Sequence, residues 1–287
     1  MHEIGDRVWA RDRYRARMPT QAEKYETFLA LHHGDSPLLL PNAWDPGTAK
    51  LFAALGFDAT ATTSGGHAAT LGRLDGKVTL DEALEHAAAL AAATPIPLNV
   101  DLENGFAHEP AEVAANVTCV AQTGAAGVSI EDFARRDDEP IYDIARAAAR
   151  VEAAAEAAHG GDARLVLTAR AENYLHGRPD LADTIARLQA YQAAGADALY
   201  APGASSVDEI RSIVSAVDLP VNVLALPNAP TVAELADLGV RRVSVGSGFA
   251  MVALSATIDA AREFLDQGTY GFWRNAGSAG TARDAFR

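Results

Sequence analysis

The stretch NVDLENGF (residues 99–106) places two acids, Asp101 and Glu103, at the end of an apolar run. In a β-strand, residues i and i+2 point to the same face, so this spacing predicts that both carboxylates look the same way. Like charges held together are costly unless a cation or a proton lies between them. Two interpretations follow: an exposed loop in which the acids are harmless, or a pair of acids that helps to hold a metal ion.

This run is one of eight apolar, β-branched runs that alternate with Ala-rich helical stretches. Strands are expected over residues 38–41, 58–64, 96–103, 127–132, 164–172, 197–203, 220–226 and 241–246. Helices are expected over residues 46–55, 79–93, 109–123, 141–158, 180–194, 206–216, 230–238 and 248–266. Alternating strands and helices pair their strands in parallel, and eight such units fit an α/β fold of the closed (β/α)8 TIM type. An open doubly wound sheet is the alternative, but no GxGxxG follows the first run.

The domain organisation predicted from the sequence is simple. Residues 20–273 are expected to form a single barrel domain, because no linker or low-complexity break interrupts residues 38–266. Within it, residues 20–34 are expected to form a helix that covers the bottom of the barrel. Residues 1–19 are expected to form an N-terminal arm, and residues 274–287 a tail that is flexible or packed on a neighbour.

Composition narrows the classes of partner. The chain has 24 basic and 38 acidic residues, a formal charge of −14, which argues against nucleic acid and anionic membranes as partners. An anionic substrate stays possible, because a local arginine or metal ion can reverse the field. The stretch MHEIGDRVWARDRYRARM (1–18) has no apolar core, so it is not expected to be a secretory signal. No run reaches the roughly 20 apolar residues that span a membrane. The single cysteine, Cys119, excludes an intrachain disulfide, fits a cytoplasmic setting and is expected to fill the core.

Candidate site residues follow from the predicted fold, because the active site of such a barrel lies at the C-terminal ends of its strands. These ends and the loops after them carry Trp44, Ser64, Gly65, Gly66, Asp75, Asp101, Glu103, Glu131, Arg170 and Asn222. An oxygen-rich set of this kind suits Mg²⁺, or Mn²⁺ in its place. The lack of a Cys/His cluster argues against zinc.

Each candidate also has a structural interpretation. A single acid at the start of a loop is more often a helix cap or a solvated charge. Glu131 and Asp132 are adjacent, so one of them must face away from the barrel interior. Arg170 either clamps a carboxylate or phosphate, or pairs with Glu172. The charged loop FARRDDEP (133–140) is either a solvated connection or a lid whose Arg135 or Arg136 closes on an anion.

The predicted chemistry is that of a small, doubly anionic substrate. Arg170 can bind one anionic end with paired hydrogen bonds, and the backbone N–H groups of Ser64, Gly65 and Gly66 can bind the other. Asn222 could bind or orient the substrate from strand seven. A metal ion on a 2-oxo acid would stabilise an enolate as a bond of that acid breaks.

The residues also resemble the isocitrate lyase / phosphoenolpyruvate mutase superfamily over residues 20–273. The likeness depends on five motifs in order: TTSGGHAATLGRLD (62–75), NVDLENGF (99–106), GVSIED (127–132), TARAENYL (168–175) and AGADALYAPG (194–203).

The resemblance implies roles for most of the candidate residues. It implies that Ser64, Gly65 and Gly66 hold the substrate carboxylate, and that Arg170 contacts substrate oxygens. The acids implied to surround Mg²⁺, with Asp101 as the foremost direct ligand, are Asp75, Asp101, Glu103 and Glu131. The resemblance also implies a last helix that is swapped between the partners of a homodimer or homotetramer.

Departures from the family decide which reaction is expected. Its lyases carry a Lys-Lys-Cys-Gly-His segment after strand four and a Glu near the end of strand six, where this chain has FARRDDEPIYD and YAPG. The mutase lid has Lys and Asn residues, whereas this loop has arginines. We therefore expect a Mg²⁺-dependent carbon–carbon lyase or decarboxylase that acts on a small 2-oxo or 2-hydroxy di- or tricarboxylate. The alternatives are phosphonopyruvate hydrolase or mutase chemistry, and a barrel that binds a 2-oxo acid without turnover.

Overall fold

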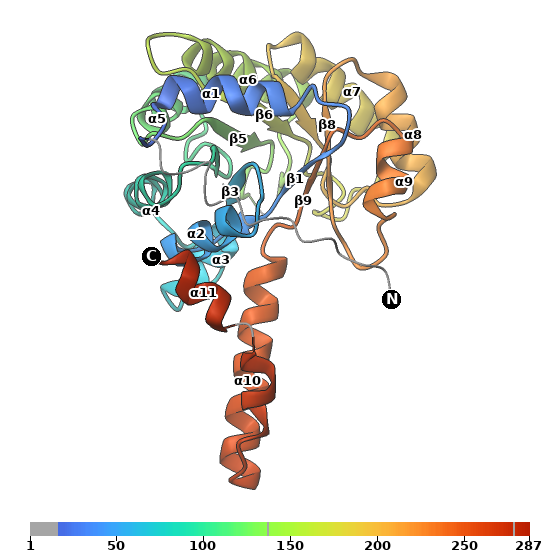
Figure 1. Cartoon of the computed structure of the whole chain (residues 1–287). Coiled ribbons are helices and arrows are strands. Elements are labelled where there is room, and N and C mark those ends of the chain that lie inside the picture. The colour runs from blue at the N-terminus through green and yellow to red at the C-terminus, as the bar shows by residue number, and fades with distance from the viewer. Residues whose placement is uncertain (1–16, 137, 278) are drawn as a thin grey trace.

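The computed structural model describes residues 17–136, 138–277 and 279–287, so most of the expected N-terminal arm lies outside the described residues. Parallel strands alternate with helices around a barrel (Figure 1). The strands are β1 (Leu38–Leu40), β2 (Asn42–Ala43), β3 (Thr60–Thr62), β4 (Leu98–Asp101), β5 (Gly127–Glu131), β6 (Val166–Arg170), β7 (Ala198–Tyr200), β8 (Val221–Leu224) and β9 (Arg242–Ser244). The helices are α1 (Gln21–Leu31), α2 (Pro46–Ala54), α3 (Ser64–Thr70), α4 (Leu80–Ala93), α5 (Pro110–Ala121), α6 (Ile144–His159), α7 (Leu181–Ala193), α8 (Val207–Ala216), α9 (Val232–Asp237), α10 (Gly248–Gln267) and α11 (Ala279–Ala285), with a 3₁₀ helix η1 (Gly271–Ala276).

The sheet closes on itself through its first strand. Its order is β1-β9-β8-β7-β6-β5-β4-β3-β2, and all pairs are parallel. β1 is the expected first strand, 38–41, and β2 continues the chain beyond it; the two are divided at Pro41, which has no N–H to donate to a neighbour. β1 pairs with β9 and β2 with β3, so the barrel is complete. The predicted (β/α)8 barrel is confirmed, and the open sheet is wrong.

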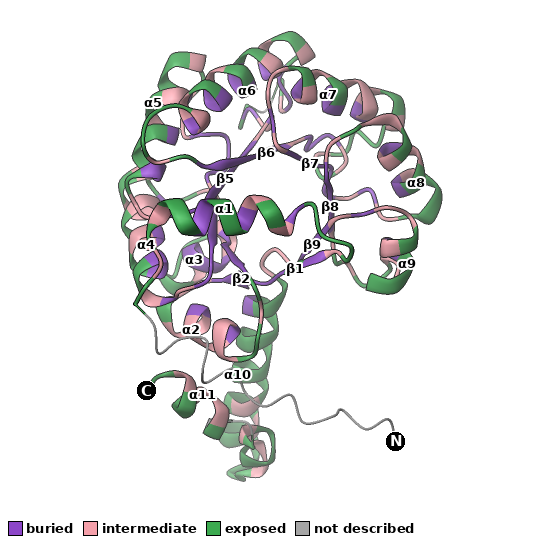
Figure 2. Ribbon diagram, turned by 45° about the horizontal axis from the view of Figure 1, so that its top comes forward, coloured by how far each residue is buried: buried purple, intermediate pink, exposed green. Residues whose placement is uncertain are grey.

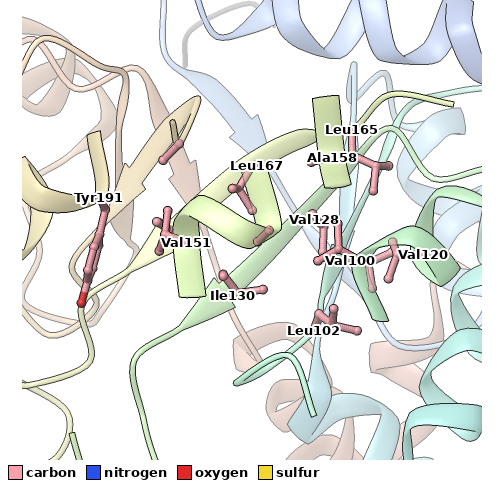
Figure 3. Packing of buried hydrophobic residues seen from close by; sticks show 14 of the residues in the cluster. Val100, Leu102, Val120, Val128, Ile130, Val151, Ala158, Leu165, Leu167 and Tyr191 are labelled. Carbon is pink, nitrogen blue, oxygen red and sulfur yellow. The ribbon is translucent and has the colours of Figure 1, made fainter. Parts of the chain in front are cut away.

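Helix α1 covers the end of the barrel at which the strands begin (Figure 2), as the sequence predicted. Its Thr20 cap satisfies the first turn through a capping box with Glu23. Phe28 is fully buried against Gly127, where an added Cβ would lie 2.5 Å from the Phe28 ring, so that position of β5 must be glycine. Apolar side chains of the strands pack against the surrounding helices, among them Val100, Val128 and Leu167 against Val120 and Val151 (Figure 3).

Two local predictions are wrong. The strand expected over 58–64 ends at Thr62, and helix α3 (Ser64–Thr70), which was not among the expected helices, follows it; α3 is capped by Thr63, whose side chain accepts a hydrogen bond from the Gly66 N–H. Cys119 was expected in the core but is exposed on α5, because the buried face of that helix is filled by valines at positions 113, 117 and 120.

The C-terminal region divides into a projecting helix and a returning one. α10 extends away from the barrel (Figure 1), and of its residues only Ala250 is buried. The tail after it forms η1 and α11, and Phe286 at its end approaches Gly47 at the start of α2. None of the helices described by the structure combines the length and the apolar character that crossing a membrane requires.

A buried arginine on α6 holds the turn that follows β4. The Arg150 side chain donates hydrogen bonds to the carbonyl oxygens of Ala107 at 2.6 Å, His108 at 2.9 Å and Asn104. Its guanidinium also lies 4.4 Å from the ring centroid of Tyr142. Residues 103, 105 and 106 of this turn have positive φ, a conformation that side chains other than glycine adopt only when their surroundings impose it. We infer that Arg150 imposes this conformation, because it binds three carbonyls of one turn.

The variant R150M should therefore lose about 2–4 kcal/mol of unfolding free energy, since it leaves buried carbonyl oxygens without donors. R146M is the matched control on the same helix, because Arg146 is partly exposed and its pair with Glu109 is worth at most about 1 kcal/mol. Urea unfolding of both variants measures the difference. Equal losses for R150M and R146M would contradict the role of Arg150.

Candidate functional site

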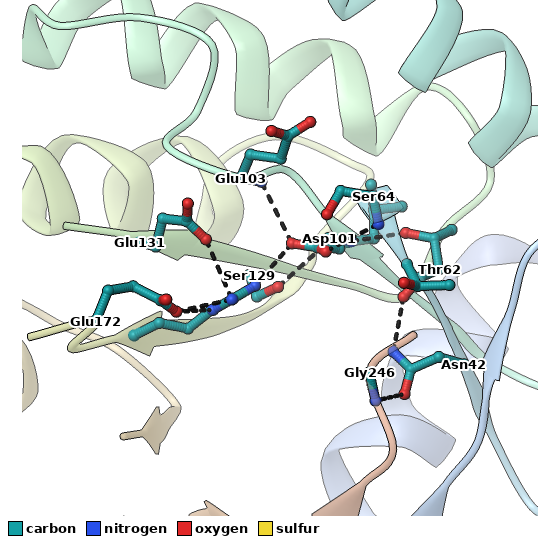
Figure 4. Close-up of polar contacts among 12 residues, drawn as sticks. Asn42, Thr62, Ser64, Asp101, Glu103, Ser129, Glu131, Glu172 and Gly246 are labelled. Atoms are coloured by element: carbon teal, nitrogen blue, oxygen red, sulfur yellow. Dashed lines mark hydrogen bonds and ion pairs between the residues drawn. The ribbon is translucent and has the colours of Figure 1, made fainter. Parts of the chain in front are cut away.

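The ends of three neighbouring strands bring charged side chains together, among them Asp101 and Glu131 (Figure 4). These acids surround Arg170. Asp101 ends β4, Glu131 ends β5 and Arg170 ends β6, where it lies opposite Glu131 in the strand register. Arg170 Nη1 lies 2.8 Å from Asp101 Oδ1, and Arg170 Nη2 lies 3.2 Å from Glu131 Oε2. The predicted gathering of Asp101, Glu131 and Arg170 at this rim is therefore present in the structure.

Glu172, two residues beyond β6, binds Arg170 most extensively. Its Oε1 accepts hydrogen bonds from Arg170 Nε at 2.8 Å and lies 2.7 Å from Nη2. Tyr200, at the end of β7, lies under the guanidinium with its ring centroid 5.3 Å away. Burial alone would lower the pKa of Arg170, but the carboxylates of Glu172, Glu131 and Asp101 raise it well above its usual value. Arg170 is thus a permanent cation.

The carboxyl groups of this rim outnumber the cations that face them. Burial raises the pKa of Glu131 well above its usual value, and Glu172 and Asp101 raise it further, whereas Arg170 lowers it. Burial likewise raises the pKa of Glu172. A single arginine does not fully compensate three carboxylates in a buried place, so the rim can accept further positive charge.

Asp101 links the barrel to helix α3. Its backbone N–H donates to Thr62 Oγ1 at 2.8 Å, and its side-chain Oδ2 accepts from the Ser64 N–H at 3.1 Å. Glu103 does not share a strand face with Asp101, contrary to the expectation, because β4 ends at Asp101 and Glu103 lies in the following turn with φ +51°. The turn still directs Glu103 to the site, where its N–H is 3.4 Å from Asp101 Oδ1 (Figure 4).

The loop 133–140 reaches the same acids. Arg135 forms an ion pair with the buried Glu103, and its Nη1 donates to the Gly76 carbonyl at 3.3 Å. Burial lowers the pKa of Arg135, while Asp75 and Asp101 raise it, so these carboxylates lie within its field. Phe133 and Ile141 form an antiparallel bridge that closes the base of the loop. Arg135 therefore lies over the rim, as the arginine of a lid would.

The two glycines of α3 lie beside other candidate residues, Gly65 beside Asp75 and Gly66 beside Trp44. A Cβ on Gly65 would stand 2.7 Å from Ser247 Oγ and 3.2 Å from Asp75 Oδ2. A Cβ on Gly66 would stand 3.0 Å from Trp44 Cβ. Both glycines are thus required by close packing. Trp44 packs on the core, and its carbonyl oxygen lies 3.0 Å from His86 Nε2.

Asn222 lies within the barrel, and its polar groups are occupied. Its Nδ2 donates to Ser244 Oγ at 2.9 Å, and its Oδ1 accepts from Arg242 Nε at 3.0 Å. Arg242 also reaches Thr168 and contacts His32 from the bottom helix. The side-chain groups of Asn222 therefore belong to the interior network of the barrel.

Sequence reasoning left Glu172 out of the site and assigned it only as a partner of Arg170. The signal that could have identified it is the alternation Arg170, Glu172 at the end of an apolar strand, the same spacing that drew attention to Asp101 and Glu103. Asp132 faces away from Arg170, as the adjacency predicted: its Oδ2 accepts from Arg187 Nη1 at 3.0 Å and from Tyr191 OH at 2.6 Å. Its Oδ1 accepts from the Glu172 N–H, so it supports the site from behind.

In this conformation, no three His, Cys, Asp or Glu side chains among the described residues are grouped as a metal site. The reason is that the candidate ligands point at arginines: Asp101 and Glu131 at Arg170, and Glu103 at Arg135. The donors are nonetheless all carboxylate oxygens, which Mg²⁺ and Mn²⁺ prefer. The rim therefore fits such an ion by donor chemistry and charge, provided that Glu103 exchanges Arg135 for the metal.

Comparisons with known proteins identify relatives of this chain. The family model for phosphoenolpyruvate phosphomutase matches residues 28–265. A crystal structure from Burkholderia cenocepacia J2315, assigned as a lyase/mutase, is 46% identical, has a TM-score of 0.89 and covers 93% of this chain and 96% of its own. A Mycobacterium tuberculosis protein is 36% identical over 241 residues, 84% of this chain and 89% of that protein.

A third relative carries an enzyme name. The oxaloacetate decarboxylase of Paraburkholderia xenovorans LB400 is 32% identical over 229 residues, 75% of this chain and 74% of that enzyme. The family model spans most of the barrel, and the charged rim occupies the place where such barrels hold their active sites. The chain therefore belongs to the phosphoenolpyruvate phosphomutase family and is a lyase of the isocitrate lyase / phosphoenolpyruvate mutase superfamily.

Proposed function

We propose that the chain is a Mg²⁺- or Mn²⁺-dependent lyase that cleaves or decarboxylates a small 2-oxo or 2-hydroxy di- or tricarboxylate, with oxaloacetate as the first substrate to test. The observation that carries the proposal is the permanent cation Arg170 enclosed by Asp101, Glu131 and Glu172 at the strand ends. Relatives named oxaloacetate decarboxylase support this choice of substrate.

The metal ligands that we propose are Asp101, Glu103 and Glu131. When bound, the divalent ion supplies positive charge to the oxygens of the substrate. Asp101 is the best placed of the three, because the Ser64 N–H and Arg170 already fix both of its oxygens. Glu103 becomes available when Arg135 leaves it, which frees the Arg135 guanidinium to meet a carboxylate of the substrate.

The bond-breaking step requires little from the protein. In oxaloacetate, the bond between C3 and the distal carboxylate breaks, its electron pair moves toward the 2-oxo oxygen, and CO₂ leaves. Arg170 stabilises the negative charge that develops on that oxygen. A proton from water then adds to C3 and gives pyruvate. The loop 133–140 contains no Cys or His that could serve as the acid, which favours a reaction in which water can do so.

Turnover of a substrate panel tests the reaction class. We expect release of CO₂ and pyruvate from oxaloacetate in the presence of Mg²⁺, and loss of this activity with EDTA. Release of phosphate from phosphonopyruvate alone would favour the carbon–phosphorus alternative, which the name of the family model keeps open. Tight oxalate binding with no turnover across the panel would favour a barrel that only binds 2-oxo acids.

The variant D101A tests the central ligand. It should lower kcat at least about 100-fold and weaken Mg²⁺ binding in calorimetry, because it removes a carboxylate on which both charge balance and metal binding depend. D58A is the control: Asp58 is exposed and precedes β3, at the opposite end of the strand. Unaltered far-ultraviolet circular dichroism would show that the fold persists. Full turnover by D101A would contradict the proposal that Asp101 is a metal ligand.

The raised pKa of Glu131 predicts a pH dependence of stability. In the metal-free protein, folded Glu131 keeps a proton that the unfolded chain releases near pH 4.5, so stability falls as pH rises from there through the folded pKa. The variant E131Q cannot ionise and should lose less stability between pH 5 and pH 8 in urea unfolding with EDTA. E156Q, at an exposed position of α6, is the control. Identical slopes for E131Q and the wild type would contradict the prediction.

We propose that α10 mediates assembly into a homodimer or homotetramer. Leu254, Ile258 and Leu265 are exposed and spaced by 4 and 7 residues, so they form one apolar stripe along a helix that projects from the barrel. An apolar stripe of this length is typical of a surface that a second copy covers.

The variant I258D should lower the mass measured by light scattering, whereas V207D, at the start of α8, should leave it unchanged. An unchanged mass for I258D would exclude this surface.

A further inference from the structure

The loop 133–140 is anchored by an aromatic stack outside the acidic rim. The Phe133 ring lies parallel to the His176 ring, with centroids 3.7 Å apart and an interplanar angle of 9°. Phe133 is also where the loop begins: it bridges Ile141, and the next residue, Ala134, donates its N–H to the Pro140 carbonyl at 2.6 Å. The position of Phe133 therefore determines the position of the base of the loop.

His176 comes from the turn after β6, which also carries Glu172. The His176 N–H donates to the Glu172 carbonyl at 3.2 Å, and His176 Nε2 lies 3.9 Å from Glu172 Oε2. Glu172 Oε1 is the oxygen that binds Arg170. His176 thus stands between the loop on one side and the ion cluster on the other.

We propose that His176 is a positioning residue, which through its stack on Phe133 holds the loop closed and so keeps Arg135 over the acids of the site. This proposal rests on the proposed function, in which the site takes an anionic substrate. His176 does not reach the reacting atoms itself. Its effect is on Arg135, which pairs with Glu103 in this structure and which, in the proposed function, passes from Glu103 to a carboxylate of the substrate. Both contacts require the loop to stay over the rim.

The surroundings of His176 favour the stacked, neutral ring. Burial lowers the pKa of His176, while Asp132 raises it and Arg170 lowers it. Arg170 neutralises the charge of the Glu172 carboxylate, so Glu172 does little to stabilise a protonated His176. A neutral imidazole over a phenyl ring gains contact area and loses little hydration when it is covered.

Two substitutions separate the stack from the contact with Glu172. H176F keeps an aromatic ring for Phe133 but has no nitrogen, whereas H176Q keeps a polar donor but has no ring. Trypsin cleavage after Arg135 or Arg136, identified by mass spectrometry, reports how often the loop opens. We expect H176Q to be cut about fivefold faster than the wild type and H176F at the wild-type rate within about twofold.

A double-mutant cycle and kinetics complete the test. F133A should accelerate cleavage as H176Q does, and the double variant should be no faster than either single one, because both changes break one contact. With oxaloacetate, H176Q should raise KM about fivefold and leave kcat nearly unchanged, and H176F should restore KM. H33Q, at an exposed histidine before β1, is the control, and melting temperatures verify folding.

The outcomes distinguish this inference from the proposed function. Slow cleavage of H176Q, fast cleavage of H176F or additive effects of F133A and H176Q would each overturn the stack as the anchor. Cleavage rates need no turnover, so a protein that ignores oxaloacetate but shows the expected cleavage pattern would contradict the reaction and keep the anchor.

Discussion

The charge balance around Arg170 is the constraint on which the site depends. A guanidinium at the end of a buried strand is stable only if carboxylates surround it, and those carboxylates remain close together only because it lies among them. The barrel fixes this arrangement, because parallel strands in register deliver Asp101, Glu131 and Arg170 to one edge. Burial first, and the excess negative charge of Glu172 and Asp101 second, raise the pKa of Glu131. The same excess charge favours the binding of a divalent cation there.

The residues that hold the loops of the site in place are as important for its geometry as the charged groups themselves. Asp132 faces outward from the rim, yet it accepts the Glu172 N–H and is itself held by Arg187 and Tyr191. Arg150 fixes the turn of Glu103 from the other side through three backbone carbonyls. Arg150 and Arg187 thus use their N–H groups to hold loops in place by hydrogen bonds. A barrel of this kind can thus change its reaction by changing loops while the strand ends stay rigid.

The loop after β5 is where this chain departs most from the lyases that its motifs resemble. It offers arginines in place of a Cys/His acid, and Arg135 reaches Glu103 across the site. An arginine cannot donate a proton near neutral pH, but it can bind a carboxylate and compensate its charge. This difference is consistent with chemistry in which the enzyme stabilises a developing charge and water supplies the proton.

The sequence by itself determined the barrel, the order of its strands and the gathering of Asp101, Glu131 and Arg170, because these follow from periodicity and from the rule that parallel strands end at one rim. Helix α3 and the exposure of Cys119 were not predicted from the sequence. Packing partners decide whether a short helix forms and which face of an amphipathic helix is buried. Only the tertiary structure placed Asn222 in the interior network and gave Glu103 its left-handed turn. It also brought Arg135 and His176 to the site, because residues far apart in the chain meet only where the fold closes.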